Sequence, residues 1–394
     1  STRKSKESTL DNMFLYGTRF LMMLRSLQVN YKTTKDTYIP SFRPNVGDVF
    51  GQGNVSGSGL APGLGFAFGF EGGETYTEKA MENGWLIVND SITTPAVYSV
   101  TEDFSYQAVL EPLPGLKINL TGTRRSNERQ SHQFMFPNLN ITRGGSFQQT
   151  AWAFGDSFDD MLVERLSGNP FPGIFSTMPN WNAKYDGLMT IIPSLSKWFK
   201  TISFSHAYNC TYNVGNYQTF PDKDVMEISS ATVTQSFAPL IGLNATLNNN
   251  ITAKSEYKTT KSGTYNTSTT TITRNSSRDL TIGVGYKIAD LNTRIGLFSS
   301  KKKKKAEVSH DFNMKLDITH IYQEVGLHKI SENYTEITSG NSSWSIKFSA
   351  DYQLSKLITM RLYYDKQINK PLVSTSYATS VSDFGMTMSL SLAR

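Results

Sequence analysis

The stretch WSIKFSADYQL, residues 344–354, decides the fold class of this chain. Apolar side chains occupy its even positions, and polar side chains occupy the odd positions between them. A period of two residues is typical of a β-strand with one apolar and one polar face. Four more stretches repeat the alternation, at 202–208, 280–288, 312–318 and 384–392. The sequence therefore predicts an all-β chain with many long strands.

Composition excludes several other classes of protein. The chain has 394 residues, enough for one large domain or two or three ordinary ones. Aromatic residues make up 12%, too many for a disordered chain, and the single cysteine, Cys210, excludes a disulfide scaffold. The longest apolar run near the start, 20–24, is far shorter than the ~20 residues of a spanning helix. The net charge of +6 is small, and the basic cluster at 301–305 has no interleaved aromatic residues, so we expect no nucleic-acid partner.

Strand length favours a membrane barrel over a soluble sheet. The predicted strands run about ten to twelve residues, whereas soluble strands average ~5–6 and bilayer-crossing strands need ~9–11. The link at 355–356 is short and the link at 366–381 is long, a contrast typical of outer-membrane barrels. The alternative is a long-stranded soluble barrel or a curved adhesin sheet. Aromatic residues expected near strand ends fit interfacial girdles: Tyr286, Tyr322, Trp344, Tyr352, Tyr363 and Tyr364.

The C-terminal half is the more regular part of the chain. Residues 200–394 predict regular long β-hairpins. The Thr/Ser-rich stretch at 259–273 predicts a flexible loop or the polar tip of a hairpin. Residues 155–200 predict a loop with short helices, because apolar residues at helical spacing favour a helix over 156–166.

The N-terminal half is less regular. Glycines and prolines crowd residues 40–80 and predict an ordered loop region around a short strand at 65–70. The mixed apolar stretch at 10–31 predicts a long strand pair or a strand and turn. The first residues, STRKS, lack the features of a signal peptide. We therefore expect that a signal was removed or that the chain is a piece of a longer protein.

Candidate catalytic and metal-binding residues are too far apart to act together. His310 and His320 share a strand face, but ten residues at ~3.3 Å each separate them by about 33 Å. Cys210 and His206 lie about 13 Å apart by the same reasoning, which favours a structural cysteine over a nucleophile. The glycines at 63–69 lack the spacing of a phosphate-binding loop, and neither GxSxG nor HExxH occurs. We therefore expect no enzymatic activity, no cofactor and no metal.

Several ordered motifs resemble the C-terminal region of the SprA (Sov) family, the outer-membrane translocons of the type IX secretion and gliding motility system. The resemblance spans roughly residues 10–394. Its motifs occur in the N-terminal, middle and C-terminal parts of the chain and follow the order of the family. They are LAPGLGFAFGF (60–70), NGWL (83–86), PNW (179–181), YDGL (185–188), SHAY (205–208), TYNVG (211–215), SADY (349–352), YDKQINKPLV (364–373) and the closing strand that starts FG (384–385).

The resemblance implies a fold and a function that composition does not show. Residues 1–394 would be the C-terminal segment of a very large antiparallel transmembrane β-barrel, with long ordered loops and a few short helices. The barrel would lie in the outer membrane of a Gram-negative bacterium, at the cell surface, and export folded cargo that carries a C-terminal sorting domain. The implied partners are the remaining N-terminal part of the same barrel, a PorV-like shuttle protein, a periplasmic plug protein, the cargo and outer-membrane lipid.

The matched residues are expected to be structural. An outer-membrane porin or a TonB-dependent-type receptor or importer is the alternative function, and a barrel enzyme is disfavoured by the missing motifs. Glycines at 63, 65 and 69 would allow close backbone approach or kinks. The motif residues are Pro62, Gly63, Gly65, Phe66, Gly69, Gly84, Trp85, Trp181, Tyr185, Gly187, His206, Tyr208, Tyr212, Gly215, Tyr352, Asp365, Asn369, Pro371, Phe384 and Gly385.

Overall fold

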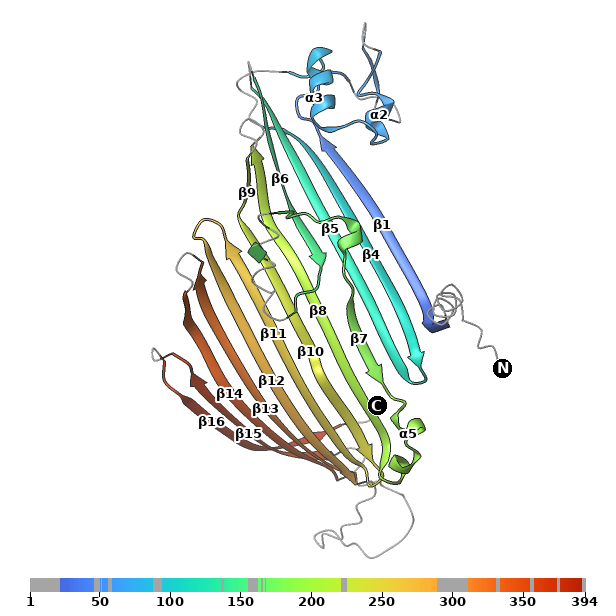
Figure 1. Cartoon of the computed structure of the whole chain (residues 1–394), viewed down its shortest axis with the longest axis vertical. Coiled ribbons are helices and arrows are strands. Elements are labelled where there is room, and N and C mark those ends of the chain that lie inside the picture. The colour runs from blue at the N-terminus through green and yellow to red at the C-terminus, as the bar shows by residue number, and fades with distance from the viewer. Residues whose placement is uncertain are drawn as a thin grey trace, which may run out of the picture.

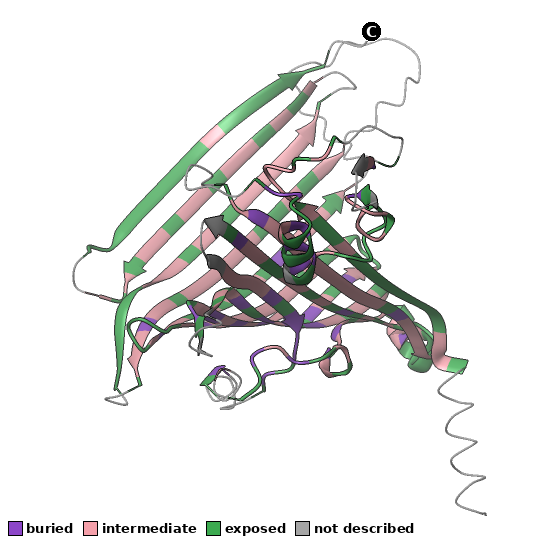
Figure 2. Ribbon diagram, turned by 90° about the horizontal axis from the view of Figure 1, so that it is seen from above, coloured by how far each residue is buried: buried purple, intermediate pink, exposed green. Residues whose placement is uncertain are grey.

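Most of the chain forms one large antiparallel sheet, which confirms the predicted all-β class. In the part of the chain that is described, this sheet has fourteen strands and forms a long curved layer (Figure 1, Figure 2). No helix in that part is long and apolar enough to cross a membrane. The computed structural model describes residues 22–45, 50, 52–55, 59–87, 94–135, 138–154, 162–163, 166, 168–220, 225–288, 311–330, 334–354, 358–373 and 376–391.

The strands follow one another across the sheet almost in chain order. The order is β1-β4-β5-β6-β8-β10-β11-β12-β13-β14-β15-β16, while β7 pairs with β5 and β8, and β9 pairs with β8. Their bounds are β1 (Leu24–Tyr38), β4 (Ala96–Leu113), β5 (Leu116–Met135), β6 (Asn138–Thr150), β7 (Asn180–Tyr185), β8 (Phe199–Phe220), β9 (Val225–Ile228), β10 (Ser230–Leu247), β11 (Ile251–Asn266), β12 (Thr271–Ile288), β13 (Phe312–Lys329), β14 (Tyr334–Gln353), β15 (Ile358–Pro371) and β16 (Thr379–Leu390).

The strands are longer than the alternation in the sequence predicts. β8 has 22 residues, and β5 and β14 have 20 each. β15 continues to Pro371 and β16 starts at Thr379, so the expected long link at 366–381 is wrong and only 372–378 joins the two strands. The stretch at 259–273 is the tip of a hairpin, with a turn at 267–270 between β11 and β12. Of the aromatic residues expected at strand ends, Tyr286 and Tyr352 lie within two residues of the ends of β12 and β14. The others lie inside their strands: Tyr322, Trp344, Tyr363 and Tyr364.

Two collinear strands share one place in the sheet. β6 and β7 both run antiparallel to β5 and β8, and Thr121 of β5 faces Asn180 while Arg124 faces Gln149. Residues 151–179 are therefore an insertion within one interrupted strand, and the expected loop at 155–200 contains a strand. We call the fully described parts of this insertion, 151–154 and 168–179, the excursion. The short helices nearby are η1 (Ile174–Ser176), α5 (Leu188–Ile191) and η2 (Pro193–Lys197).

A hydrophobic core lies between the excursion and the sheet. Tyr208, Cys210 and Tyr212 alternate along β8, so their side chains share one face, and all three are fully buried. The excursion covers them with Ala151 and Ala153, which are also buried. The other buried members are Phe147, Leu162, Val214, Ile228, Ala231, Val233 and Ile272.

A helical module lies beyond the last residues of β1 and the first of β4 (Figure 1). The expected strand at 65–70 is wrong, because α2 (Leu64–Ala67) occupies it. The amides of Phe70 and Glu71 both donate to the Gly65 carbonyl, at 2.8 and 3.0 Å, and so close a turn after the helix. The module also contains α3 (Gly73–Glu82) and a hairpin of β2 (Gly53–Val55) and β3 (Gly59–Ala61).

Some predictions fall outside the described residues. They are the first part of the strand pair expected at 10–31, most of the helix at 156–166, the basic cluster at 301–305, His310 and the link at 355–356. The later part of 10–31 belongs to β1, which is a single strand in its described residues.

Candidate functional site

The two faces of the sheet differ in polarity, and this difference is the main candidate for function. We call the end where β8 begins and β12 ends the near end, and the opposite end the far end; the near end is at the bottom of Figure 1. Along the near half, one face is apolar. Cross-strand rows of this apolar band on β12, β13 and β14 are Leu280–His320–Trp344, Ile282–Ile318–Ile346, Val284–Leu316–Phe348, Tyr286–Met314–Ala350 and Ile288–Phe312–Tyr352.

The apolar band is large and uncovered on β12. Ile282 is 45% exposed and Val284 is 46% exposed, although both are fully apolar. From Leu280 to Ile288 the band extends roughly 26 Å along the strand at ~3.3 Å per residue. On strands tilted by roughly 35–45° this length corresponds to a height of about 19–22 Å, slightly less than the ~25 Å apolar belt of outer-membrane barrels. Apolar residues on so many neighbouring strands need a non-aqueous cover.

An aromatic line bounds the apolar band on the side of the far end. Directly beyond it the same face becomes polar, as with Glu324 on β13 and Thr33 on β1. Aromatic rings at such a boundary are typical of a membrane–water interface, because they have an apolar body and a polarisable edge. The aromatic line consists of Phe384, Tyr364, Trp344, Tyr322, Tyr257, Phe237, Tyr208, Trp181, Phe104 and Tyr31.

The aromatic line crosses the strands at an angle. When paired residues are followed from strand to strand, Phe384 on β16 lies level with Ile202 on β8. In the same way, Tyr31 on β1 lies level with Tyr212 on β8. These two positions are ten residues apart, 212 minus 202, or roughly 33 Å along β8. Eleven spacings of ~4.8 Å separate β1 from β16, roughly 53 Å, so the line is inclined by about 32°. Strands of membrane barrels tilt by roughly 35–45°, which produces such a drift.

The opposite face is polar and hollow. A depression of about 720 Å³ is lined mainly by Ser, Thr, Asn, Gly, Lys and Asp side chains of β8 and β10 to β14. Opposite charges are interleaved there, with Lys315 Nζ 2.8 Å from Asp317 and Lys254 Nζ 3.0 Å from Glu256. A Cβ on Gly283 would meet Asp317 Oδ1 at 2.6 Å, so the glycine keeps this wall open. This polar face can hold water but presents no single charge sign.

Both edges of the sheet carry exposed backbone and apolar side chains. Within the described residues, β1 pairs with β4 and β16 pairs with β15, and each is the last strand on its side. Met386 and Met388 on β16 are 65% and 67% exposed, and Val29 on β1 is 56% exposed. Open edges of this length are templates for pairing with further strands.

Motif residues of the middle part converge on an aromatic cluster on β7 and β8. The Trp181 and Tyr208 rings are stacked with centroids 4.5 Å apart, and His206 lies 6.2 Å from Trp181. Phe154 of the excursion stacks on Tyr208 at 4.9 Å, and the Tyr208 hydroxyl accepts a hydrogen bond from the Ala153 amide at 2.9 Å. The cluster therefore attaches the excursion to the sheet at the aromatic line.

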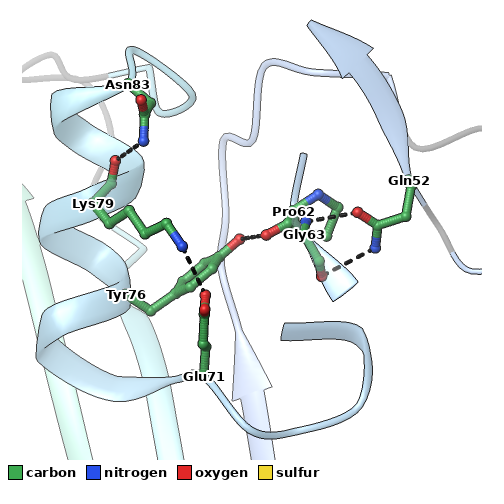
Figure 3. Close-up of polar contacts among 7 residues, drawn as sticks. All are labelled: Gln52, Pro62, Gly63, Glu71, Tyr76, Lys79 and Asn83. Atoms are coloured by element: carbon green, nitrogen blue, oxygen red, sulfur yellow. Dashed lines mark hydrogen bonds and ion pairs between the residues drawn. The ribbon is translucent and has the colours of Figure 1, made fainter. Parts of the chain in front are cut away.

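Motif residues of the N-terminal part lie in the helical module. Tyr76 Oη donates to the Pro62 carbonyl at 2.7 Å (Figure 3). The Tyr76 ring stacks on that of Phe66 with centroids 4.5 Å apart. Burial, followed by the Glu71 carboxylate, raises the pKa of Tyr76 far above its ordinary value, so the hydroxyl stays a donor. Gly84 ends α3 with φ +66, a conformation that favours glycine.

The module is also joined internally and to the sheet by side-chain contacts. Gln52 and the backbone of Gly63 exchange two hydrogen bonds, at 2.6 and 3.2 Å (Figure 3). The buried Trp85 ring packs edge-on against Phe42 at 6.3 Å. His132 Nδ1 on β5 lies 3.0 Å from Thr77 Oγ1, so α3 contacts the apolar face of the sheet beyond the aromatic line.

The remaining motif residues are spread over turns and the last strands. A Cβ on Gly187 would clash with the Pro114 carbonyl oxygen, and one on Gly215 would meet Ser230 Oγ at 2.8 Å. Asn341 Nδ2 donates to Asn369 Oδ1 at 3.1 Å beside Pro371. The motifs thus form three groups, on the module, on β7–β8 and on β14–β16, and not one site. Tyr185 is the last residue of β7, four residues beyond Trp181, and pairs with Phe204. On the last strands lie Tyr352, Asp365, Asn369, Pro371, Phe384 and Gly385.

The sequence did not show which residues complete the aromatic line and the excursion. Phe104, Tyr257, Phe237 and Trp152 were not singled out, although Phe104 continues an alternating pattern on β4. Tyr363, expected in a girdle, lies on the polar face because it is one residue out of register with Tyr364.

Comparisons with known proteins add no relatives. No protein-family model matches the chain, and no curated protein matches it. Among the described residues, no group of three or more His, Cys, Asp or Glu side chains is placed to hold a metal ion.

Proposed function

We propose that this chain is the C-terminal segment of a large outer-membrane β-barrel that exports folded proteins. The observation that carries the proposal is the inclined apolar band with its aromatic line on one face, opposite a hollow polar face. A band of constant height on tilted strands must cross them obliquely, as this one does. The motifs that resemble the SprA (Sov) family supply the proposed cargo and partners.

The open edges support a barrel larger than this chain. Twelve strand positions tilted by about 32° would close into a barrel roughly 22 Å wide between backbones. A folded domain of 100 residues has a diameter of roughly 34 Å, and lumen side chains need about 5 Å more on each side. Passage of such a domain therefore requires about 25 strands, within the range of known single-chain barrels. The rest of the barrel would pair with β1 and β16.

The polar face suits transport of many cargoes. Its interleaved charges and small hydroxyl side chains stay hydrated, and its charge pairs neutralise each other locally. A lumen of this kind does not bind one cargo surface strongly. We propose no catalytic role for the chain and no cofactor. In this proposal a PorV-like shuttle, a periplasmic plug protein and cargo with a C-terminal sorting domain are its partners.

Depletion of the full-length protein in its native cell tests the proposal. Cargo that bears a C-terminal sorting domain should then accumulate, folded, in the periplasm while other outer-membrane proteins remain normal. Re-expression of the full-length protein should restore export. Normal cargo export after depletion, combined with loss of uptake of a small solute, would instead identify a porin or a receptor.

A further inference from the structure

The excursion carries apolar side chains that remain exposed, although two of them also contact the aromatic cluster on one side. Phe175 is fully exposed, and Trp152, Phe154 and Met178 are 42%, 47% and 37% exposed. We call these four residues the apolar shelf. Both parts of the excursion, 151–154 and 168–179, lack charged residues altogether, although 18% of the chain is charged. The sequence between the two parts, 155–167, has five charged residues (Asp156, Asp159, Asp160, Glu164 and Arg165), so the lack of charge is confined to the two described parts.

The apolar shelf lies on the aromatic line. The Trp152 and Phe154 rings lie 6.1 and 6.3 Å from the ring of Trp181, which belongs to the line. Trp152 Nε1 donates to the Pro179 carbonyl at 2.7 Å, which joins the two parts of the excursion. The shelf is therefore continuous with the apolar band at its boundary.

The part of the excursion around Phe175 is held over β4 and β5 at the same boundary. Arg124 Nε donates to the Pro172 carbonyl at 3.1 Å, and Tyr106 Oη donates to the Thr177 carbonyl at 3.1 Å. Tyr106 is two residues from Phe104, on the same face and on the band side of the aromatic line. Phe175 thus extends outward where the line crosses β4.

We propose that the apolar shelf inserts into the lipid headgroup layer and anchors the far half of the sheet to the membrane surface; this inference rests on the proposed function. Rings prefer the headgroup layer because it accepts their apolar bodies and their polar edges. The prolines of the excursion suit such a layer, because Pro170, Pro172 and Pro179 have no amide donor to leave unpaired. The partner is thus a lipid interface, in contact with a loop that never crosses the bilayer.

The helical module offers a matched surface outside the membrane. Phe70 is 83% exposed, comparable to Phe175, and belongs to the module beyond the end of β1. From Tyr31 on the aromatic line to the end of β1 at Tyr38, seven residues extend roughly 23 Å. A phenyl ring there is too far from the band to reach lipid.

Site-specific photocrosslinking in the full-length protein in its own membrane tests the inference. Phe175→p-benzoylphenylalanine, Phe70→p-benzoylphenylalanine and Val284→p-benzoylphenylalanine are compared, with heat-modifiable migration on gels as the check of assembly. We expect lipid adducts, identified by peptide mass, at 175 and 284, exceeding those at 70 by about tenfold. Met178→p-benzoylphenylalanine replaces the first variant if that variant fails to assemble.

The outcomes separate the two proposals. Lipid adducts at 284 with protein crosslinks or no adduct at 175 overturn the lipid anchor and leave the membrane barrel standing; protein crosslinks identify a partner protein on the shelf. Lipid adducts absent at 284 overturn the membrane barrel, and with it the anchor. Adducts at 175 equal to those at 70 contradict an interfacial position for the shelf.

Discussion

Strands β12 to β16 and strands β6 to β8 differ in how the apolar face of the sheet is covered. On β12 the apolar side chains alternate without interruption, and Val284 is left 46% exposed. On β8 the same face carries Tyr208 and Val214, both fully buried, under the excursion of an interrupted neighbouring strand. The difference shows that the chain covers this face itself where the face passes the aromatic line and leaves it exposed below the line.

The covered region should be the more sensitive to truncation of a side chain. Tyr208→Ala removes a ring that packs on Trp181, Phe154 and Phe237, so we expect the free energy of unfolding to fall by about 3–5 kcal/mol. The measurement is urea-induced unfolding of the full-length protein, combined with limited proteolysis of the excursion. Tyr208→Phe is the control and should cost about 1–3 kcal/mol, because it removes only the hydroxyl that accepts the Ala153 amide. Equal effects of the two variants would contradict a packed aromatic cluster.

The uncovered region should be sensitive to charge instead. Val284→Arg places a cation in the middle of the apolar band and should lower stability in lipid by about 2–4 kcal/mol. Thr281→Arg, on the polar face of the same strand, should change it by less than about 0.5 kcal/mol. Unfolding in lipid vesicles gives both values. A similar loss of stability at the two positions would mean that both faces of the sheet contact the same solvent.

The smallest expected effect lies in the helical module, remote from both regions. Gly84→Ala forces a side chain into φ +66 at the end of α3 and should cost about 1 kcal/mol. Hydrogen exchange should report faster opening of α3 alone, with β12 unchanged. Glu82→Ala, two residues earlier and exposed, is the control. Faster exchange that spread to β12 would show that the module and the band unfold together, against the separation described here.

The alternation in the sequence predicted an apolar face on the last strands. Only the pairing register shows where along each strand the apolar band ends. Trp344 was expected at a strand end and lies ten residues inside β14, because polar alternation continues beyond the aromatic line. The stretch at 65–70 alternates small and aromatic residues like a strand, yet Gly63 at φ +97 and the bonds to Gly65 fold it into a helical turn. Two-residue periodicity cannot distinguish these cases.

The excursion could not be predicted from the sequence, because its anchors are distant in the chain. Phe154 stacks on Tyr208, and Arg124 donates to Pro172, contacts that no local pattern encodes. The middle motifs signalled Trp181 and Tyr208 as anchors but gave no indication that Phe154 would pack against them. The lack of charged residues at 168–179 is visible in the sequence. It could be interpreted only once the structure had placed this stretch beside the aromatic line.

The most direct test of the central claim is a depth profile along β12 in the membrane. Single spin labels at each position from 274 to 288 of the full-length protein are compared for access to oxygen and to a water-soluble nickel complex. We predict lipid-like access at even positions from Leu280 to Tyr286, aqueous access at the odd positions between them, and aqueous access at every position before Arg278. Aqueous access at both even and odd positions along the whole strand would contradict a membrane-spanning band.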